Sequence, residues 1–588
     1  MDNWRKSVIE VALGKKPAEL VIRGGTLVNV NTRELYPVDV AITAGRIAIV
    51  GDVSEAMNNE TVVVNAEGLF LVPGFIECHW HTEDSQVTLT ELSKVLLPHG
   101  VTSIMYAHEI ANVFGVRGQE AVVNEARQVP LKVFFEIPPS VPWARGLENA
   151  GVTLSVEDVR EMLSWKEAVS LGESDVFDIL NLDKDILAKL DAAAELGKPV
   201  NGHAAMVSGN QLMAVIAGAF HDDHENYFGE ELLTKARLGL RVLVREFNVP
   251  DLIPALVASK IDTHNMMFAI DDKPIHYLAM TGGVDSAIRA AIAAGLDPLT
   301  AIQMGTINAA NHFRKDHDIG SISPGRIADL FLTDSLENLT AKTVVANGIV
   351  VGRDGQFLLD LPAYHYPGWM KHSVRLSQPA QAEQFEIHPG IEEGQAEVRV
   401  FVLSEHGFVR TLETRKFTVH NGKLDVETIG QYNRVAVIER HSGKGRTSLG
   451  LIDGFGMKKG AMASTIGHDS HNITVIGTNT ADMAECVNAL ARAGGGYVAV
   501  ADGKVVAQVE LEVAGLITET PYEKVIEKLG HFEEVIRSEL GFPEDMMFLM
   551  ITAFVFQGTP FQTAITDVGI IDTYSQTILP LIVSTTQA

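Results

Sequence analysis

Residues 73–317 alternate short apolar runs with amphipathic helical patterns, and few folds accommodate such an alternation over this length. The apolar runs include PGFIECHWH, VTSIMYAHE, LKVFFEIPP, AVSLGESD, PVNGHAA and NMMFAIDD, and stretches such as SVEDVREMLSWKE and DKDILAKLDAAAELG separate them. A chain that repeats strand and helix in this way forms a parallel sheet covered by helices. About 245 residues is also an ordinary size for a (β/α)8 TIM barrel, so we expect this α/β fold here.

Strand-like segments flank this region on both sides in the sequence. Residues 1–72 contain β-branched runs such as ELVIRGGTLVNV and DVAITAGRIAIVGD, and residues 318–370 contain GSISPGRIADLFLTD and KTVVANGIVVGRDG. Gly and Asn interrupt these runs, as in β-hairpins. We expect the two flanks to form one small β-sandwich domain into which the barrel, residues 73–317, is inserted.

Residues 371–588 have a different character. The Pro- and Gln-rich stretch around PAYHYPGWMKHSVRLSQPAQ indicates a linker, and the strand patterns AEVRVFVL, FTVHNGKL and RVAVIERH follow it. A Gly-rich segment, IDGFGMKKGAMAST, and a helical pattern, TADMAECVNALARA, come next. The mixture predicts a separate C-terminal α/β domain.

Composition excludes several classes of function. The net charge of −28 opposes binding to nucleic acid or to an anionic membrane through bulk electrostatics. The two cysteines, Cys78 and Cys486, rule out a disulfide framework and fit a reducing compartment. The first residues lack the pattern of a signal peptide, and no apolar run reaches the roughly 18 to 20 residues of a membrane span. We therefore expect a cytoplasmic protein whose partner is a small molecule.

Polar side chains stand at the ends of the apolar runs, where a barrel of this kind carries its active site. His79 and His81 are one residue apart, and alternate side chains of a strand point to the same side. An HxH pair alone can be structural, so its partners decide the interpretation. The ends of later runs supply Glu173, His203, His224 and Asp271. Four imidazoles and two carboxylates are a ligand set for two divalent cations bridged by a carboxylate.

Longer stretches of the chain match a known pattern. PGFIECHWH and GSISPGRIADLFL bound the barrel region, and the matches extend to HEIANVFG, NGHAAMVSGNQLMAVIAGAFHDDHE, AIDD and GFGMKKGAMASTIGHDSHNITVIG. The chain resembles the adenine deaminase family of the metal-dependent amidohydrolase superfamily. The last stretch is the most specific signal, because most amidohydrolases lack this C-terminal region. The resemblance covers nearly the whole chain, although Thr82, Asp84 and Gln86, beside the HxH pair, differ from the family pattern.

The resemblance implies roles for these residues. One metal takes His79 and His81, the second takes His203 and His224, and Glu173 bridges the two metals. Asp271 is a metal ligand and transfers protons as the catalytic base and acid; Asp272 is adjacent, and we choose Asp271 because it is nearer the strand. The resemblance also implies two divalent ions per subunit, Mn²⁺ or Fe²⁺ with Zn²⁺ as an alternative, and a homodimer.

Other residues are candidates to act on the substrate. Glu83 and His108 are candidates both for catalysis and for substrate binding, and Glu109 and Arg245 are candidates for substrate binding. The alternative for Glu83 and His108 is a hydrogen bond that supports a metal ligand. The alternative for Arg245 is an ion pair with Glu246.

The expected reaction is the hydrolytic deamination of adenine, or of a related amino-heterocycle, by hydroxide generated at the metal centre. Adenine and water would give hypoxanthine and ammonia. One alternative is a cyclic amidase that opens a hydantoin- or lactam-like ring with the same metals. A catalytically silent relative is a further alternative, and a complete ligand set argues against it.

A second polar cluster, GHDSHN, lies in the C-terminal region. His468, Asp469 and His471 could bind a third ion or close over the mouth of the barrel, and a simple turn or helix cap is the structural alternative. The sequence does not choose among these interpretations.

Overall fold

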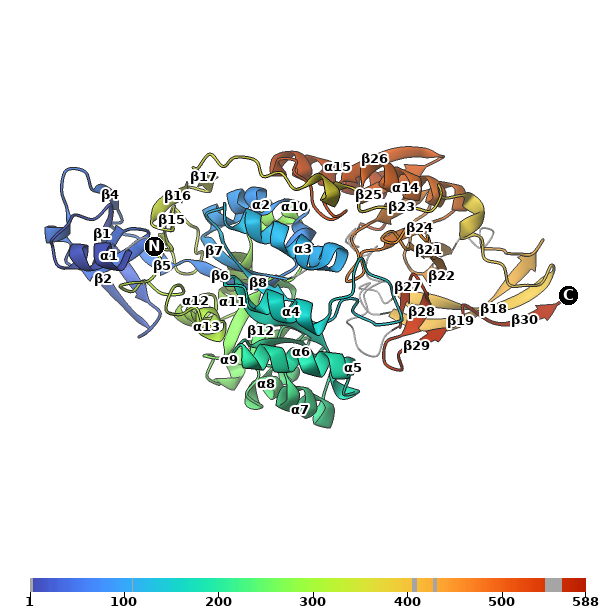
Figure 1. The fold of residues 1–588 in the computed structure, drawn as a ribbon, viewed down its shortest axis with the longest axis horizontal. Helices are drawn as coiled ribbons and strands as arrows, with labels where there is room; N and C mark the ends of the chain where they lie inside the picture. The colour runs from blue at the N-terminus through green and yellow to red at the C-terminus, as the bar shows by residue number, and fades with distance from the viewer. Residues whose placement is uncertain (1–3, 108, 404–409, 427–430, 545–562) are drawn as a thin grey trace.

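Eight parallel strands form the centre of the molecule (Figure 1). The computed structural model describes residues 4–107, 109–403, 410–426, 431–544 and 563–588. The central strands form a five-stranded sheet and a three-stranded sheet, each paired in parallel. They are β6 (Phe75–Trp80), β7 (Val101–Tyr106), β8 (Lys132–Ile137), β9 (Ala168–Asp175), β10 (Val200–His203), β11 (Asp222–Asp223), β12 (Arg241–Arg245) and β13 (Met266–Ala269).

The two sheets join at both edges. At one edge the backbone N–H of Asp271, just after β13, donates to His79 O at 3.1 Å, and the N–H of His81 donates to Asp271 O at 3.0 Å. At the other edge the N–H of His221 donates to Val200 O at 2.9 Å. The predicted closed (β/α)8 barrel is therefore confirmed.

Helices surround the barrel strands (Figure 1). They are α2 (Leu89–Leu96), α3 (Glu109–Ala126), α4 (Val156–Leu163), α5 (Val176–Leu180), α6 (Lys184–Glu195), α7 (Gly209–Gly218), α8 (Gly229–Arg237), α9 (Val249–Ser259), α10 (Ile275–Thr281), α11 (Val284–Ala293), α12 (Pro298–Met304) and α13 (Ile307–His312). Local sequence sets some of their ends. Ser155 and Asp158 form a reciprocal capping box at the start of α4, which satisfies N–H groups that a helix leaves unpaired.

A nine-stranded sheet lies at one end of the barrel (Figure 1). Its strands are β1 (Leu20–Asn29), β2 (Glu34–Thr43), β3 (Arg46–Gly51), β4 (Val62–Asn65), β5 (Phe70–Pro73), β14 (Leu330–Thr333), β15 (Thr343–Ala346), β16 (Ile349–Arg353) and β17 (Gln356–Phe357). β5, which precedes the barrel, pairs antiparallel with β14, which follows it. Helix α1 (Trp4–Ala12) packs against this sheet through a buried cluster that includes Val8 and Val11.

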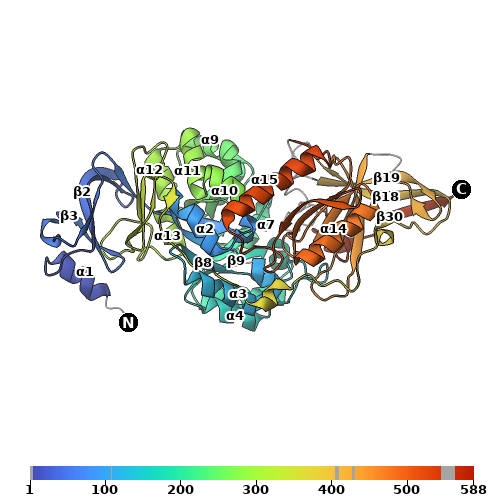
Figure 2. The same ribbon diagram turned by 90° about the horizontal axis from the view of Figure 1, so that it is seen from above.

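The C-terminal region lies at the opposite end of the barrel in both views (Figures 1 and 2). Its ten-stranded sheet contains β18 (Gly394–Leu403), β19 (Arg410–His420), β20 (Lys423–Leu424), β21 (Tyr432–Ile438), β22 (Thr447–Asp453), β23 (Ala461–Ser464), β24 (Ile473–Gly477), β25 (Gly496–Ala501), β26 (Lys504–Glu510) and β30 (Ile582–Gln587). A smaller sheet contains β27 (Thr563–Thr566), β28 (Gly569–Asp572) and β29 (Thr577–Leu579). The α-helices among the described residues of this region are α14 (Thr480–Ala493) and α15 (Tyr522–Ser538).

The C-terminal region contacts the barrel at the carboxyl ends of its strands. Helix α15 lies beside α10 (Figure 2). The hydroxyl of Tyr277 on α10 donates to Glu533 Oε1 on α15 at 3.0 Å. The N–H of Thr518 donates to Gln86 O at 3.0 Å, beside the end of β6. The face of the barrel that carries the predicted site is thus covered by a second part of the chain. Among the described helices, none is both long and apolar enough to cross a membrane.

Candidate metal centre

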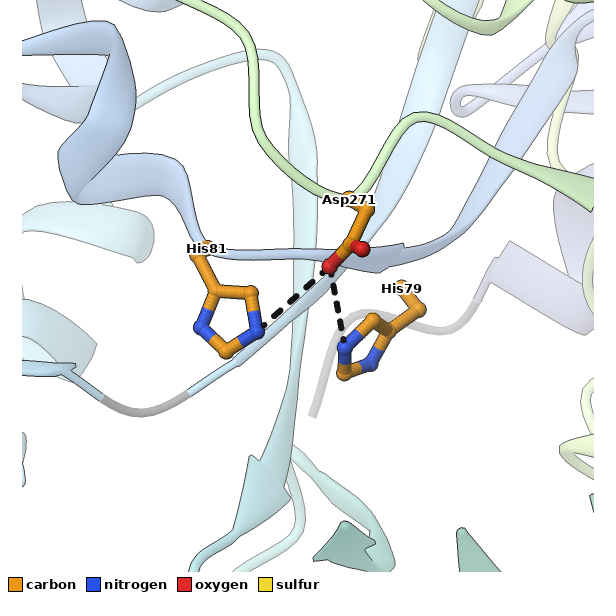
Figure 3. A group of neighbouring side chains, drawn as sticks. All are labelled: His79, His81 and Asp271. Carbon is orange, nitrogen blue, oxygen red and sulfur yellow. Dashed lines mark ion pairs between the residues drawn. The ribbon is translucent and has the colours of Figure 1, made fainter. Parts of the chain in front are cut away.

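His79 and His81 direct their imidazoles toward Asp271 (Figure 3). The two histidines lie at the end of the first barrel strand, β6, and Asp271 follows the last, β13. The Nε2 atoms of both histidines lie 3.6 Å from Asp271 Oδ1. All three side chains are buried. Because β6 and β13 are neighbours where the barrel closes, His81 and Asp271 face one another although they are 190 positions apart in the sequence. The predicted strand order requires this.

Buried carboxylates hold the other ring nitrogen of each of these histidines. His79 Nδ1 lies 2.7 Å from Glu136 Oε2, and His81 Nδ1 lies 2.5 Å from Glu109 Oε1. A carboxylate accepts, so each Nδ1 carries a proton, and in the neutral ring Nε2 then presents its lone pair to the centre. Nε2 of His79 has no hydrogen-bond partner among the described residues. This arrangement is the one that a metal-binding histidine requires.

Glu173 lies between the two pairs of histidines. Its Oε1 is 3.1 Å from His81 Nε2 and 4.0 Å from His79 Nε2. Its Oε2 is 2.7 Å from His203 Nδ1 and 3.5 Å from His224 Nε2. The structure thus brings the six predicted ligands together, and one carboxylate faces both pairs, as a bridging ligand must.

Asp271, rather than Asp272, faces the histidines. Its backbone adopts φ = 73°, a left-handed conformation that non-glycine residues rarely take. The guanidinium of Arg245 donates to Asp271 Oδ2 at 2.5 Å. The side chain of Asp272 is 45% exposed and points instead toward His468, 3.7 Å away. The geometry therefore agrees with the choice of Asp271, which the sequence favoured only because it is nearer the strand.

The electrostatics of the centre depend on these neighbours. Burial opposes ionisation of Asp271, but Arg245 and the adjacent histidines outweigh it and lower the pKa of this carboxyl. Burial likewise opposes a charge on His79, yet Glu136 and Glu173 raise its pKa to about 9. Burial and the neighbouring His79 lower the pKa of His224 well below its usual value. The cluster of buried anions matches a site that stabilises positive charge.

Glu83 is a buried carboxyl beside the centre, on the 3₁₀ turn Thr82–Ser85. It accepts a hydrogen bond from the hydroxyl of Tyr106 and another, at 3.0 Å, from the N–H of Ile110. Burial, followed by the charge of Glu109, raises the pKa of Glu83 to about 8, so near neutral pH it is mostly the uncharged acid. This state suits the predicted catalytic role. His108 lies outside the described residues.

Glu109 and Arg245, predicted to bind substrate, contact residues of the centre. Glu109 holds His81, and Arg245 forms ion pairs with Asp271 and Glu225. The alternative partner considered for Arg245, Glu246, is instead bonded by Lys273 Nζ at 2.6 Å. Both residues are therefore placed where they orient other groups, and their binding of substrate stays a prediction.

Glu136 is a functional candidate that the sequence did not predict. It stands on β8, whose run LKVFFEIPP predicts a strand but no site residue. The signal was a glutamate inside an otherwise apolar run, which burial would penalise unless the carboxylate had a partner.

The cluster His468, Asp469 and His471 also lies at the centre. His468 Nε2 is 2.8 Å from Asp84 Oδ2, its Nδ1 is 3.2 Å from Glu109 Oε1, and its ring lies 4.8 Å from that of His81. His471 Nε2 contacts the other oxygen of Glu109. The C-terminal region thus reaches the side chains that surround the predicted metal ligands, which a simple turn or helix cap would not explain.

Comparison with known proteins identifies the family. A model of the adenine deaminase C-terminal domain matches residues 408–577, and a model of the amidohydrolase family matches residues 70–354. The chain is 39% identical over 588 residues to a protein named adenine deaminase from Moorella thermoacetica, with 98% of each chain covered. It is 37% identical over 575 residues to adenine deaminase 3 of Rhizobium meliloti, with 96% of each chain covered.

This chain belongs to the adenine deaminase family. The match to both domain models confirms the resemblance found in the motifs, including GFGMKKGAMASTIGHDSHNITVIG in the C-terminal region. Among solved structures, the β-aspartyl dipeptidase of Fervidobacterium islandicum AW-1 is 18% identical, covering 58% of this chain and 99% of that one, with a TM-score of 0.43. Membership of the amidohydrolase family, together with the buried His, Asp and Glu cluster, indicates a divalent metal site in this adenine deaminase family member.

The contact between Glu136 and His79 gives a first prediction. Replacing Glu136 by Ala should weaken binding of Mn²⁺ by about 10- to 100-fold, because His79 loses the acceptor that fixes its tautomer. Glu136→Gln should weaken it less, since the amide oxygen can still accept. Chelator competition measures the affinity.

The matched control is Glu125→Ala, because Glu125 is an equally buried carboxylate that bonds Thr90 and Tyr366 and no histidine. The control should bind Mn²⁺ as the unmodified protein does. Unchanged Mn²⁺ affinity in Glu136→Ala would contradict the assigned role.

Proposed function

We propose that this protein is a metal-dependent hydrolase that converts adenine and water to hypoxanthine and ammonia. The observation that carries the proposal is the position of Glu173 between two pairs of buried histidines, a geometry suited to a bridged pair of metals. The substrate is supported by relatives named adenine deaminase that match nearly the full chain at 39% and 37% identity. These names favour deamination over the cyclic amidase.

We further propose two divalent ions per subunit, Mn²⁺ or Fe²⁺. His79 and His81 would hold one, His203 and His224 the other, and Glu173 and Asp271 would complete the set. Imidazole and carboxylate ligands suit these ions. Bound at this centre, the cations would lower the pKa of water and so supply a nucleophile near neutral pH.

The side chains around the centre supply the proton transfers. Asp271 accepts the proton of the attacking water as the new C–O bond forms at C6 of the purine, and it returns a proton toward the leaving amino group. Arg245 holds Asp271 in place through Oδ2, which leaves Oδ1 on the side of the histidines. Glu83, uncharged near neutral pH, donates its proton to ring nitrogen N1, and the proton that the new C6 hydroxyl loses as the carbonyl of hypoxanthine forms replaces it. Breakage of the C6–N bond releases ammonia.

The proposal extends to the organisation of the protein. We propose a β-sandwich domain of residues 1–72 with 318–370, a catalytic barrel of residues 73–317 and a C-terminal domain of residues 371–588. The pairing of β5 with β14 supports the insertion of the barrel between the two flanks. We also propose a cytoplasmic homodimer, the state that the family resemblance implies.

A substrate panel tests the proposed function. Protein loaded with Mn²⁺ or Fe²⁺ should release one ammonia per adenine consumed, with the accompanying ultraviolet change from adenine to hypoxanthine. Hydantoin and dihydropyrimidines, assayed in parallel for new carboxylate, should remain intact. Ring opening of these compounds without turnover of adenine would replace the deaminase by the cyclic amidase.

A further inference from the structure

One segment of the C-terminal region, residues 467–472, connects β23 to β24 and enters the mouth of the barrel. Its His471 is fully buried and contacts Glu109, a residue 362 positions earlier in the chain. Glu109 is also fully buried, at the start of α3. The contact therefore joins two parts of the fold in a place that water does not reach.

Hydrogen bonds define which nitrogen of His471 carries the proton. The backbone N–H of Gly467 donates to His471 Nδ1 at 3.2 Å, so Nδ1 acts as an acceptor. The proton must then lie on Nε2, which donates to Glu109 Oε2. Burial lowers the pKa of His471, in agreement with a neutral ring.

Glu109, held by His471, in turn fixes the ring of the proposed metal ligand His81. Its second oxygen, Oε1, accepts from His81 Nδ1 at 2.5 Å, while Asn112 Nδ2 also donates to Oε2 at 3.3 Å. Each oxygen thus has its own donors, and the carboxylate cannot turn without losing one of them. His81 consequently presents Nε2 toward Glu173 and Asp271.

The segment itself is held from the C-terminal side. The buried guanidinium of Arg440 donates through Nε to His471 O and through Nη2 to Ala514 O, the latter at 2.9 Å. From the barrel side, Asn112 Nδ2 donates to Asp469 O at 2.9 Å. The position of His471 is therefore determined by both parts of the chain.

We propose that His471 is a positioning residue of the metal centre, and that the C-terminal region completes the hydrogen-bonded shell around the metal ligand His81 through Glu109. This inference rests on the metal site proposed above. It assigns to the C-terminal region a part in metal binding at the barrel, in place of the third-ion site or simple closure considered for GHDSHN.

The test measures Mn²⁺ affinity of the full chain by chelator competition, which requires no turnover. His471→Ala should weaken the binding of one of the two ions by about 10- to 100-fold, as loss of a partner behind a metal-binding histidine does. His471→Gln should restore most of this affinity, because its amide nitrogen can occupy the place of Nε2 and donate to Glu109.

A double-mutant cycle distinguishes a positioning role of His471, which acts through Glu109, from a general loss of structure in the variant. In a Glu109→Ala background, the further change His471→Ala should alter Mn²⁺ affinity by less than about twofold, because both side chains act through one hydrogen-bonded chain. The matched control is His441→Ala, which removes a contact to Ser470 O, 2.7 Å away, in the same segment but touches neither Glu109 nor His81. It should bind Mn²⁺ normally.

Three results would overturn the inference: unchanged affinity in His471→Ala, equal losses in His471→Ala and His441→Ala, or full additivity with Glu109→Ala. A protein that binds two Mn²⁺ ions with this dependence on His471 but does not deaminate adenine would refute the proposed function alone. The two proposals therefore fail in different ways.

Discussion

Replacement of Asp271 by Asn should lower the rate of ammonia release from adenine by about 10²- to 10⁴-fold, the contribution expected of a general acid–base group. The change preserves the shape of the side chain and its bond to Arg245, but the amide cannot accept and return a proton. Initial rates on metal-loaded protein, with metal content measured on the same sample, give the result.

Asp272→Asn is the matched control for this substitution. Asp272 is the adjacent residue, is 45% exposed and faces His468 instead of His79 and His81. It should retain the rate of the unmodified protein within a few-fold. A rate loss confined to Asp272→Asn would move the catalytic role to that residue.

Replacement of Glu173 by Gln should remove most of the activity, by about 10³-fold, because a metal centre supplies several kcal/mol of the stabilisation of the transition state. Glu173 is the described carboxylate that contacts both pairs of histidines, so its loss weakens both sites together. Elemental analysis should find fewer than two metal ions per chain in the variant.

The comparison with Glu136→Gln makes this prediction specific. Glu136 contacts His79 alone among the proposed ligands, so its amide variant should keep the second ion, whereas Glu173→Gln should lose affinity at both positions. Two tightly bound ions in Glu173→Gln would show that this carboxylate does not bridge the metals.

Much of the fold and of the ligand set could be predicted because the signals are local. Most of the barrel strands are short apolar runs with polar residues at or just after their carboxyl ends, and the order of strands around a barrel follows the order of the chain. His79, His81, Glu173, His203, His224 and Asp271 could therefore be placed on one rim before any coordinates were known, and the structure brings them together there.

The partners of these residues could not be predicted in the same way. Glu136 and Glu109 carry no periodic signal, and a buried glutamate looks the same in sequence whether it supports a ligand or contacts the substrate. Glu109 and Arg245 are assigned a positioning role because Glu109 contacts His81 and Arg245 contacts Asp271, and in each pair the two residues come from different elements of the barrel.

The sequence by itself determined which side chains the chemistry has available and on which strands they stand, because strand periodicity and strand order are properties of neighbouring residues. Only the tertiary structure turned the side chain of Asp271, and not that of Asp272, toward His79 and His81, through a left-handed backbone at Asp271, and only it joined His471 to Glu109. These choices depend on hydrogen bonds between segments hundreds of residues apart, whose geometry exists only after the barrel closes and the C-terminal region docks on it.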